Sequence, residues 1–406
     1  MPPHDIHITG FRVLLIGEKS RLHSLTGGQN VKSPDFASQR VPKLLKYGRS
    51  LAFVVVVLVV ASMNRRELDI ALLLVAGLAF GIGCRSGRGV SPSQPSGQES
   101  TSLRPTVNMR PLTDRKFERT PERLVRGRYL VNGIGECFAC HGPFESNAPG
   151  WPPVRGKEGS GLAGFSSSPG VVAANLTPDR ETGIGNWTDD MLARAIREGI
   201  SHDGHLIDPT IMPYEFYRSM SDEDLASVIV YLRSIPPIRN AFPASRTSRN
   251  IVAPYAIPIY APVPPPDLST PIKRGAYLVR VGACQWCHTL RDANRKLLPG
   301  LDFAGGDLIT TTDFQVTSAN LTPDPSGISY YDEAMFLKVM HTGKVGARNI
   351  RPIMPWWFFG QMNDDDLKAI FAYLRTLKPV HHRVDNTEPI TYCRICKRKH
   401  HGGALN

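Results

Sequence analysis

Two short stretches decide the fold: residues 137–141 read CFACH, and residues 284–288 read CQWCH. C-x-x-C-H is the attachment signal of a c-type haem. Two thiols at this spacing add to the two vinyl groups of the porphyrin, and the histidine that follows ligates the iron. The sequence therefore predicts two covalently bound haem c groups. The predicted attachment residues are Cys137, Cys140, Cys284 and Cys287, and the predicted proximal ligands are His141 and His288.

Other interpretations of C-x-x-C are a redox-active dithiol and half of a zinc site. Neither explains why a histidine follows both pairs at the same place in an internal repeat. The repeat extends well beyond the cysteines, and its offset falls only from 148 to 142 residues along the chain. Its matching segments are RGRYLV and RGAYLV at 126 and 274, NLTPD at 175 and 320, and IMP at 211 and 353.

A steady offset predicts two copies of one domain. We place the copies at residues 121–240 and 272–382, and we expect a stiff proline-rich linker at 241–271. Residues 84–120 are rich in Ser, Pro, Gly and Arg, so we expect a flexible tether there. Residues 383–406 form a basic tail with two cysteines.

A haem iron with one histidine ligand needs a sixth ligand or stays open, and methionine is the usual partner in electron-transfer cytochromes. Three methionine pairs recur between the copies. Met212 and Met354 lie in loops and precede prolines that fix the chain, so they are our predicted axial ligands. The pairs Met191/Met335 and Met220/Met362 lie at helix starts, where methionines more often pack in the core. His202 and His205 are rival ligands, but the second copy has no histidine in their place.

The amino-terminal residues 1–83 are expected to be a leader. Residues 51–62 and 70–83 are apolar runs of the length of a signal-peptide core, too short for a membrane span of ~20 residues. Cys84 follows the second run like the lipidated cysteine of a bacterial lipoprotein, which favours Met63 as the real start. An uncleaved amino-terminal hydrophobic anchor is the alternative. Both interpretations export the rest of the chain to the periplasmic side of a bacterial membrane.

The net charge of +12 is typical of nucleic-acid-binding proteins, but its distribution argues against that partner. Residues 127–390 carry 25 basic and 27 acidic side chains, so the excess lies in the termini. A basic leader suits export and a membrane surface, and we expect no nucleic acid.

The third C-x-x-C, at Cys393 and Cys396, is followed by Lys397 instead of histidine. Too few residues remain for another haem domain. A disulfide in an oxidising compartment is one interpretation, and a small metal site that uses His400 or His401 is the other.

The repeated motifs resemble those of class I cytochrome c domains. Residues 121–390 are similar, more narrowly, to the multihaem cytochrome c subunits of bacterial membrane-bound alcohol, gluconate and sorbitol dehydrogenases. The stretch 175–187, NLTPDRETGIGNW, is the most specific piece. Those subunits usually carry three haems, whereas this chain has two C-x-x-C-H sites.

The resemblance implies a mainly α fold of two tandem class I domains with long loops around each haem. In the first copy we expect helices at 121–134, 189–198 and 222–234. The first and last helices of such a domain cross closely, which Gly127 and Gly275 permit.

The expected function is single-electron transfer, from a periplasmic dehydrogenase towards a quinone, oxidase or cytochrome acceptor of the respiratory chain. We find no fingerprint of a second catalytic site, so we expect an electron carrier without enzymatic chemistry. A di-haem peroxidase, which needs one open iron position, and a haem-binding sensor module are the alternatives.

Overall fold

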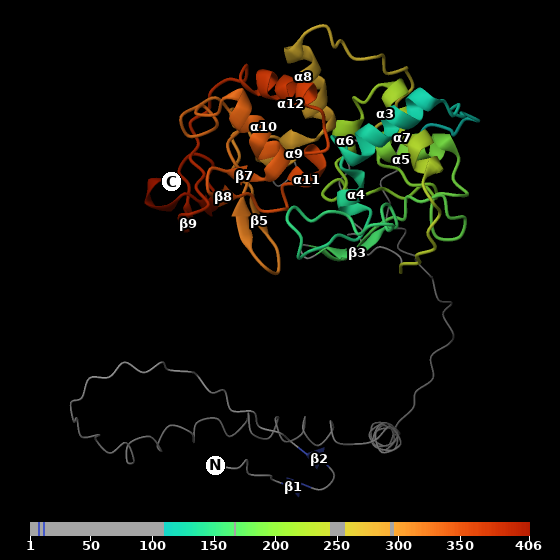
Figure 1. Cartoon of the computed structure of the whole chain (residues 1–406), viewed down its shortest axis with the longest axis horizontal. Coiled ribbons are helices and arrows are strands. Elements are labelled where there is room, and N and C mark those ends of the chain that lie inside the picture. The colour runs from blue at the N-terminus through green and yellow to red at the C-terminus, as the bar shows by residue number, and fades with distance from the viewer. Residues whose placement is uncertain (1–6, 9–10, 13–108, 166–167, 244–255, 293–295) are drawn as a thin grey trace, which may run out of the picture. The chain divides into compact units, whose positions relative to one another are not determined.

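The computed structural model describes residues 7–8, 11–12, 109–165, 168–243, 256–292 and 296–406 (Figure 1). The chain divides into two units, residues 1–100 and 101–406. Of the first unit, the described part is the antiparallel pair β1 (His7–Ile8) and β2 (Phe11–Arg12). The expected leader features, including Met63 and Cys84, lie outside the described residues. Among the residues described, no helix is both long and apolar enough to cross a lipid bilayer.

The first repeat is built on three main helices: α3 (Pro121–Asn132), α5 (Asp189–Glu198) and α7 (Asp222–Ser234). Two shorter helices lie between them, α4 (Cys137–Cys140) and α6 (Tyr214–Tyr217). The bounds of α5 and α7 are the predicted ones, because Thr188 and Ser221 cap their first turns through side-chain oxygens. Helix α3 ends two residues before the predicted 134, since the backbone leaves the helical region at Gly133.

The second repeat has the same order of helices: α8 (Pro271–Val281), α9 (Cys284–His288), α10 (Glu333–Thr342), α11 (Trp356–Phe359) and α12 (Asp364–Leu374). Its first and last helices begin like those of the first repeat. Thr270, like Thr120, caps a helix with proline in its first turn, and Asn363 takes the place of Ser221.

Helices α3 and α7 cross in contact, and α8 and α12 cross in the same way. A Cβ atom on Gly127 would collide with the backbone of Ser227, and one on Gly275 would collide with that of Ala369. The crossings therefore require glycine, as expected from the resemblance.

The strands of both repeats and of the tail are short and form antiparallel pairs. The described fold is therefore mainly α-helical. The pairs are β3 (Leu162–Phe165) with β4 (Ser168–Ala173), β5 (Leu308–Thr310) with β6 (Gln315–Thr317), β7 (Lys344–Val345) with β8 (Arg348–Asn349), and β9 (Ile390–Tyr392) with β10 (Lys399–His401). A last turn of 3₁₀ helix, η2 (Gly403–Leu405), follows β10.

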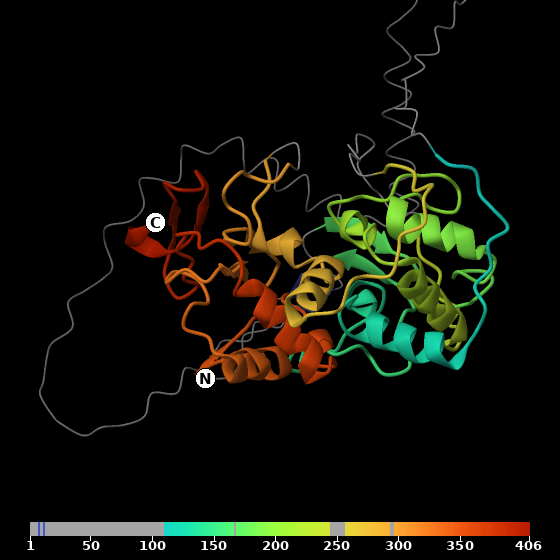
Figure 2. The same cartoon turned by 90° about the horizontal axis from the view of Figure 1, so that it is seen from above.

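The two repeats lie side by side and share one hydrophobic core, with their long helices adjacent in both views (Figures 1 and 2). The contact is reciprocal. The hydroxyl of Tyr129 donates to Asp366 Oδ2 at 2.6 Å, and that of Tyr277 donates to Asp224 Oδ2 at 2.6 Å. In each bond, the tyrosine of one repeat reaches the aspartate of the other, at equivalent positions. The interface within this one chain therefore resembles that of a two-fold symmetric dimer.

The end of the expected flexible tether is bound to the first repeat. Arg110, 7% exposed, makes ion pairs with Asp190 at 2.7 Å and with Glu198 at 2.8 Å, both on α5. Thr113 adds a backbone hydrogen bond to Asp190 at 2.7 Å. Residues 109–120 therefore differ from the expectation, because buried charges hold them against α5.

Candidate haem sites

Each C-x-x-C-H segment forms a short helix after a sharp turn in the backbone. Glu136, just before α4, has φ of 40°, and Ala283, just before α9, has φ of 49°. Both values lie in the left-handed region that non-glycine residues rarely adopt. Because this turn recurs at the same position of both repeats, each C-x-x-C-H segment follows its long helix in the same way.

Both segments border one continuous cavity of about 3510 Å³. Its lining includes all four predicted attachment cysteines, namely Cys137, Cys140, Cys284 and Cys287. A single small-ligand pocket measures about 300–1,000 Å³, so this cavity has room for more than one large cofactor.

The two predicted proximal histidines are held in the same way. His141 Nδ1 lies 2.8 Å from the carbonyl oxygen of Ala174, and His288 Nδ1 lies 2.7 Å from that of Ala319. A carbonyl can only accept, so Nδ1 carries the hydrogen, and Nε2 is left as the free ligand atom. Burial lowers the pKa of both imidazoles against the opposing effect of these carbonyls, which favours the neutral, iron-binding form.

The N-L-T-P-D motif holds the carbonyls that orient these histidines. Asn175 accepts a bond from the Thr177 backbone N–H at 2.9 Å and donates to the Ile238 carbonyl at 2.7 Å. Asn320 repeats both bonds, with Thr322 at 2.9 Å and with the Val380 carbonyl at 2.9 Å. The motif thus ties the residue after each orienting carbonyl to the chain beyond the last helix. The sequence alone did not indicate this role of the motif, because its hydrogen-bond partners Ile238 and Val380 lie about 60 residues away.

Met212 and Met354 form the repeated methionine pair that borders the cavity in both halves. Each lies in a turn closed by its own backbone N–H, to Asp208 at 3.0 Å and to Arg351 at 3.1 Å. The other two pairs border it in the first half alone, through Met191 and Met220.

Three methionines of the other two repeated pairs have packing roles. The backbone N–H of Thr188 donates to Met191 Sδ at 3.4 Å, so this sulfur helps to cap α5. Met220 and Met362 are each 3% exposed and belong to the shared core.

The rival histidines of the first repeat also border the cavity, and each has a neighbour. The ring of His202 stacks on that of Trp187, with centroids 4.3 Å apart. His205 pairs with Asp203, and both side chains are more than half exposed. Trp187 has Tyr331 as its counterpart in the second repeat, and both rings line the cavity.

No protein-family model matches the chain. Several curated proteins are similar to it, however. The gluconate 2-dehydrogenase cytochrome c subunit of Pantoea cypripedii is 27% identical over 62% of this chain and 59% of its own length. The fructose dehydrogenase cytochrome subunit of Gluconobacter japonicus is 29% identical over 63% of the chain and 52% of its own length. A diheme cytochrome c-type protein of Cereibacter sphaeroides is 28% identical over 61% of the chain and 83% of its own length.

The chain thus spans little more than half the length of the dehydrogenase subunits that it matches, and most of the diheme cytochrome. Relatives of this kind carry covalently bound haem c, which fits the cavity and its paired C-x-x-C-H segments. They support electron transfer as the general role and a helical cytochrome fold. Homologues of this chain thus include the cytochrome c subunits of gluconate, fructose and alcohol dehydrogenases and a diheme cytochrome c.

Proposed function

We propose that this chain is a di-haem c-type cytochrome that carries single electrons and does no bond chemistry of its own. The observation that carries the proposal is the repetition of one arrangement: C-x-x-C-H, a carbonyl on Nδ1 and a methionine, twice around one cavity. In this proposal, residues 121–240 and 272–382 are two class I cytochrome c domains.

The protein's own groups have separate tasks. Cys137 and Cys140 would attach the first haem, and Cys284 and Cys287 would attach the second. His141 and Met212 would hold the first iron, and His288 and Met354 would hold the second. A haem held in this way would supply a reversible one-electron couple, and a thioether ligand raises its potential. With both ligands in place, neither iron would offer substrate or peroxide an open coordination site.

The shared cavity suits a relay. Both attachment segments border the same space, so an electron that enters at one site has a short path to the other. The direct contact between the repeats keeps that path constant, since shared core residues and the Tyr–Asp bonds join them.

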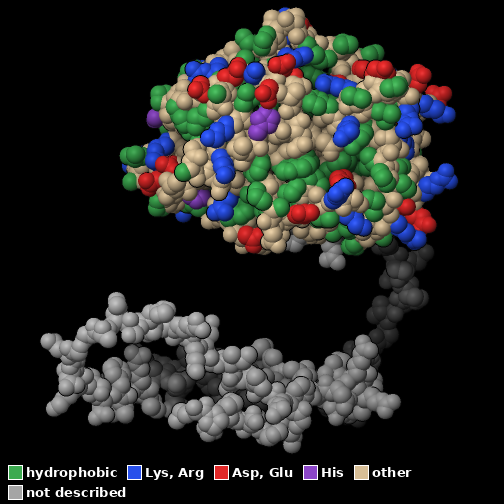
Figure 3. Space-filling view, in the orientation of Figure 1, with side chains coloured by type: hydrophobic (Ala, Val, Ile, Leu, Met, Phe, Trp, Pro, Cys, Tyr) green, Lys and Arg blue, Asp and Glu red, His purple; other side chains and the backbone are tan. Residues whose placement is uncertain are grey.

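A periplasmic dehydrogenase is the proposed electron donor, and a quinone, oxidase or further cytochrome is the proposed acceptor. Five of the similar proteins carry names of dehydrogenase cytochrome subunits, which supports this donor class. On the face in Figure 3, acidic and basic side chains are interspersed, and residues 127–390 carry 25 basic and 27 acidic side chains, so we expect little electrostatic steering of the partner. We therefore expect docking through a stable complex or through a membrane tether, by lipid on Cys84 or by the amino-terminal hydrophobic segment.

The proposal is tested on the purified full chain, produced in a host that attaches haem c. A pyridine haemochrome assay is expected to report two haems per chain; one or three would contradict the proposal. Rapid mixing of the reduced protein with hydrogen peroxide is expected to show oxidation without enzyme-like turnover. Turnover above about 1 s⁻¹ would favour the di-haem peroxidase instead.

A further inference from the structure

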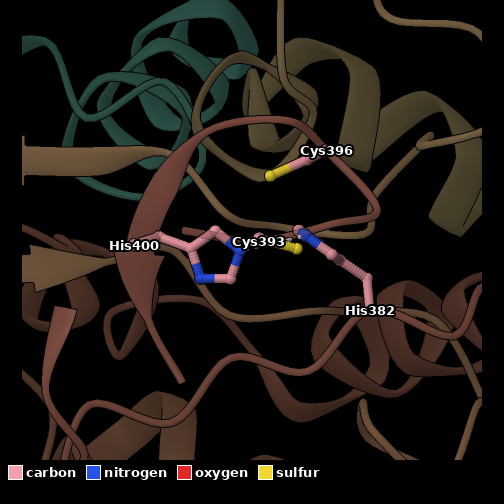
Figure 4. A group of neighbouring side chains, drawn as sticks. All are labelled: His382, Cys393, Cys396 and His400. Carbon is pink, nitrogen blue, oxygen red and sulfur yellow. Dashed lines mark hydrogen bonds between the residues drawn. The ribbon is translucent and has the colours of Figure 1, made fainter. Parts of the chain in front are cut away.

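The carboxyl-terminal tail folds back on the second repeat as a hairpin. Cys393 and Cys396 lie in the turn between β9 and β10, and His400 lies on β10. His382 comes from the segment that follows α12. These four side chains meet, although none of them belongs to a haem site (Figure 4).

The four side chains form a compact and buried group. Their potential ligand atoms all lie within 4.8 Å of one another. His382 and His400 are fully buried, Cys393 is 1% exposed and Cys396 is 5% exposed. The two cysteines are not bonded to each other in this structure. Leu290, Leu301 and Ala304 pack around the sulfurs, so the group has an apolar wall.

Hydrogen bonds to carbonyls fix the protonation of both rings. His382 Nδ1 donates to the Ala304 carbonyl at 2.9 Å, and His400 Nδ1 donates to the His401 carbonyl at 2.8 Å. In each neutral ring Nε2 therefore carries the lone pair, and the two Nε2 atoms face each other at 3.2 Å. Two lone pairs at this distance repel unless a proton or a metal ion lies between them. Metal-binding histidines are oriented by such bonds from the other ring nitrogen.

The spacing agrees with tetrahedral coordination of zinc. With Zn–N bonds of about 2.0–2.1 Å, two nitrogen ligands of a tetrahedral ion lie about 3.3 Å apart. Two sulfur ligands with Zn–S bonds of about 2.3 Å lie about 3.8 Å apart. The Nε2 separation of 3.2 Å and the 4.8 Å limit on all pairs both agree with these values.

A comparison of the two repeats shows what is particular to the second. The position of His382 is taken in the first repeat by Asn240, because the backbone N–H groups of Asn240 and His382 donate to the equivalent hydroxyls of Thr182 and Ser326. Asn240 donates its side-chain amide to the Ser160 carbonyl at 2.9 Å, and His382 Nδ1 makes the matching bond to Ala304 at 2.9 Å. The second repeat thus has an imidazole, with a second ring nitrogen that can bind a metal, where the first has an amide.

We propose that His382, Cys393, Cys396 and His400 bind one Zn²⁺ ion as a tetrahedral structural site. Two cysteines at C-x-x-C spacing with two histidines are a ligand set of structural zinc, with no open position. With a disulfide instead, the two Nε2 atoms would share a proton and the sulfurs would take no part, whereas one metal ion engages all four side chains. The zinc site is separate from the haem sites and does not depend on their number.

The ion would hold the tail against the loop beside the second haem site. His401, next to a ligand, donates its backbone N–H to Thr317 Oγ1 at 3.1 Å. Thr317 lies two residues before Ala319, whose carbonyl orients His288. The site therefore stiffens the segment that orients this proximal histidine.

The test uses the full holoprotein after exhaustive dialysis against metal-free buffer. Elemental analysis against a protein concentration from amino-acid analysis is expected to give one zinc per chain. X-ray absorption at the zinc edge is expected to show two sulfurs at about 2.3 Å and two nitrogens at about 2.0–2.1 Å. The haem irons do not contribute at this edge, so the result is independent of the haem count.

Four variants separate ligands from their neighbours. Cys396→Ser and His382→Gln are expected to lose the bound zinc. His381→Gln and His401→Gln are the matched controls, because each alters a histidine adjacent to a proposed ligand. His381 has 76% of its side chain exposed, and His401 Nδ1 contacts Thr317 Oγ1 at 2.8 Å. Both controls are expected to keep one zinc per chain.

Thiol alkylation decides between zinc and a disulfide even if a variant fails to fold. The unaltered chain is denatured with a chelator and without reductant, and the peptide carrying residues 393–396 is analysed by mass. Alkylation of both cysteines is expected. A disulfide in this peptide, a chain without zinc, or an absorption spectrum with only oxygen and nitrogen ligands would overturn the proposal.

Discussion

Met212 and Met354 are the residues on which the proposed chemistry depends most. A thioether in the sixth position makes an electron carrier, whereas an open position makes a peroxidase or a sensor. Their turns are closed by backbone bonds to Asp208 and Arg351, so each sulfur has a defined place at the cavity.

Met212→Ala and Met354→Ala are each expected to remove about half of the weak long-wavelength absorption band of methionine-bound ferric haem. Each is also expected to lower the midpoint potential of one haem, because the thioether favours the reduced iron. Spectra of the oxidised protein and a potentiometric titration measure both effects. Met220→Ala is the control, since Met220 borders the cavity from the core. Loss of the band in this variant would transfer the ligand role to Met220.

At the scale of helices, the crossings of α3 with α7 and of α8 with α12 form the frame of each repeat. Each frame holds a C-x-x-C-H segment at the end of its first helix, so the crossing sets the position of the cysteines that we propose attach haem. The glycines at the crossings allow a backbone contact that no other residue permits.

Gly127→Ala and Gly275→Ala are each expected to destabilise the protein by about 1–3 kcal/mol. The added methyl group meets the fixed backbone of the partner helix, and such overpacking costs about this much. Urea unfolding of the holoprotein measures the change. Val125→Ala, on the same helix as Gly127 and 71% exposed, is the control and is expected to stay within about 0.5 kcal/mol of the parent. Equal stability of all three variants would mean that the helices do not cross as described.

At the scale of the whole molecule, the reciprocal Tyr–Asp bonds make one body of two repeats. The two bonds are equal in length, but their surroundings differ. Asp224 also pairs with Arg126 at 2.7 Å, whereas Asp366 has Arg274 at 3.5 Å. Asp366 therefore relies more on the hydroxyl of Tyr129 than Asp224 relies on that of Tyr277.

Tyr129→Phe is expected to cost about 1.5–3 kcal/mol, the range for a hydrogen bond to a charged group. Tyr277→Phe is expected to cost less, because Arg126 still holds Asp224. In the double variant we expect the two losses to add in one unfolding transition, since the Arg291–Glu215 ion pair at 2.6 Å and the shared core still join the repeats. Scanning calorimetry measures both effects, with Tyr260→Phe, 70% exposed, as the control. A larger loss from Tyr277→Phe would contradict this account of the interface.

The sequence by itself determined the features that depend on neighbouring residues. The haem-attachment signal spans five residues, and the starts of α5 and α7 follow from capping residues directly before them. Because the chain contains two copies of the repeat, the attachment signal occurs twice. The crossings at Gly127 and Gly275 were expected from the resemblance to class I cytochrome c domains, whose first and last helices cross closely, and glycine permits such an approach.

The tertiary structure alone decided the features that join distant residues. Arg110 meets Asp190 across 80 positions, and Tyr129 meets Asp366 across 237, with no local pattern to indicate either contact. His382 joins Cys393, Cys396 and His400, whereas the first repeat has Asn240 at the equivalent position, so the repeat gave no signal for the cluster. Helix propensity and capping depend on the residues of short segments, whereas such contacts form only when packing brings separate segments together.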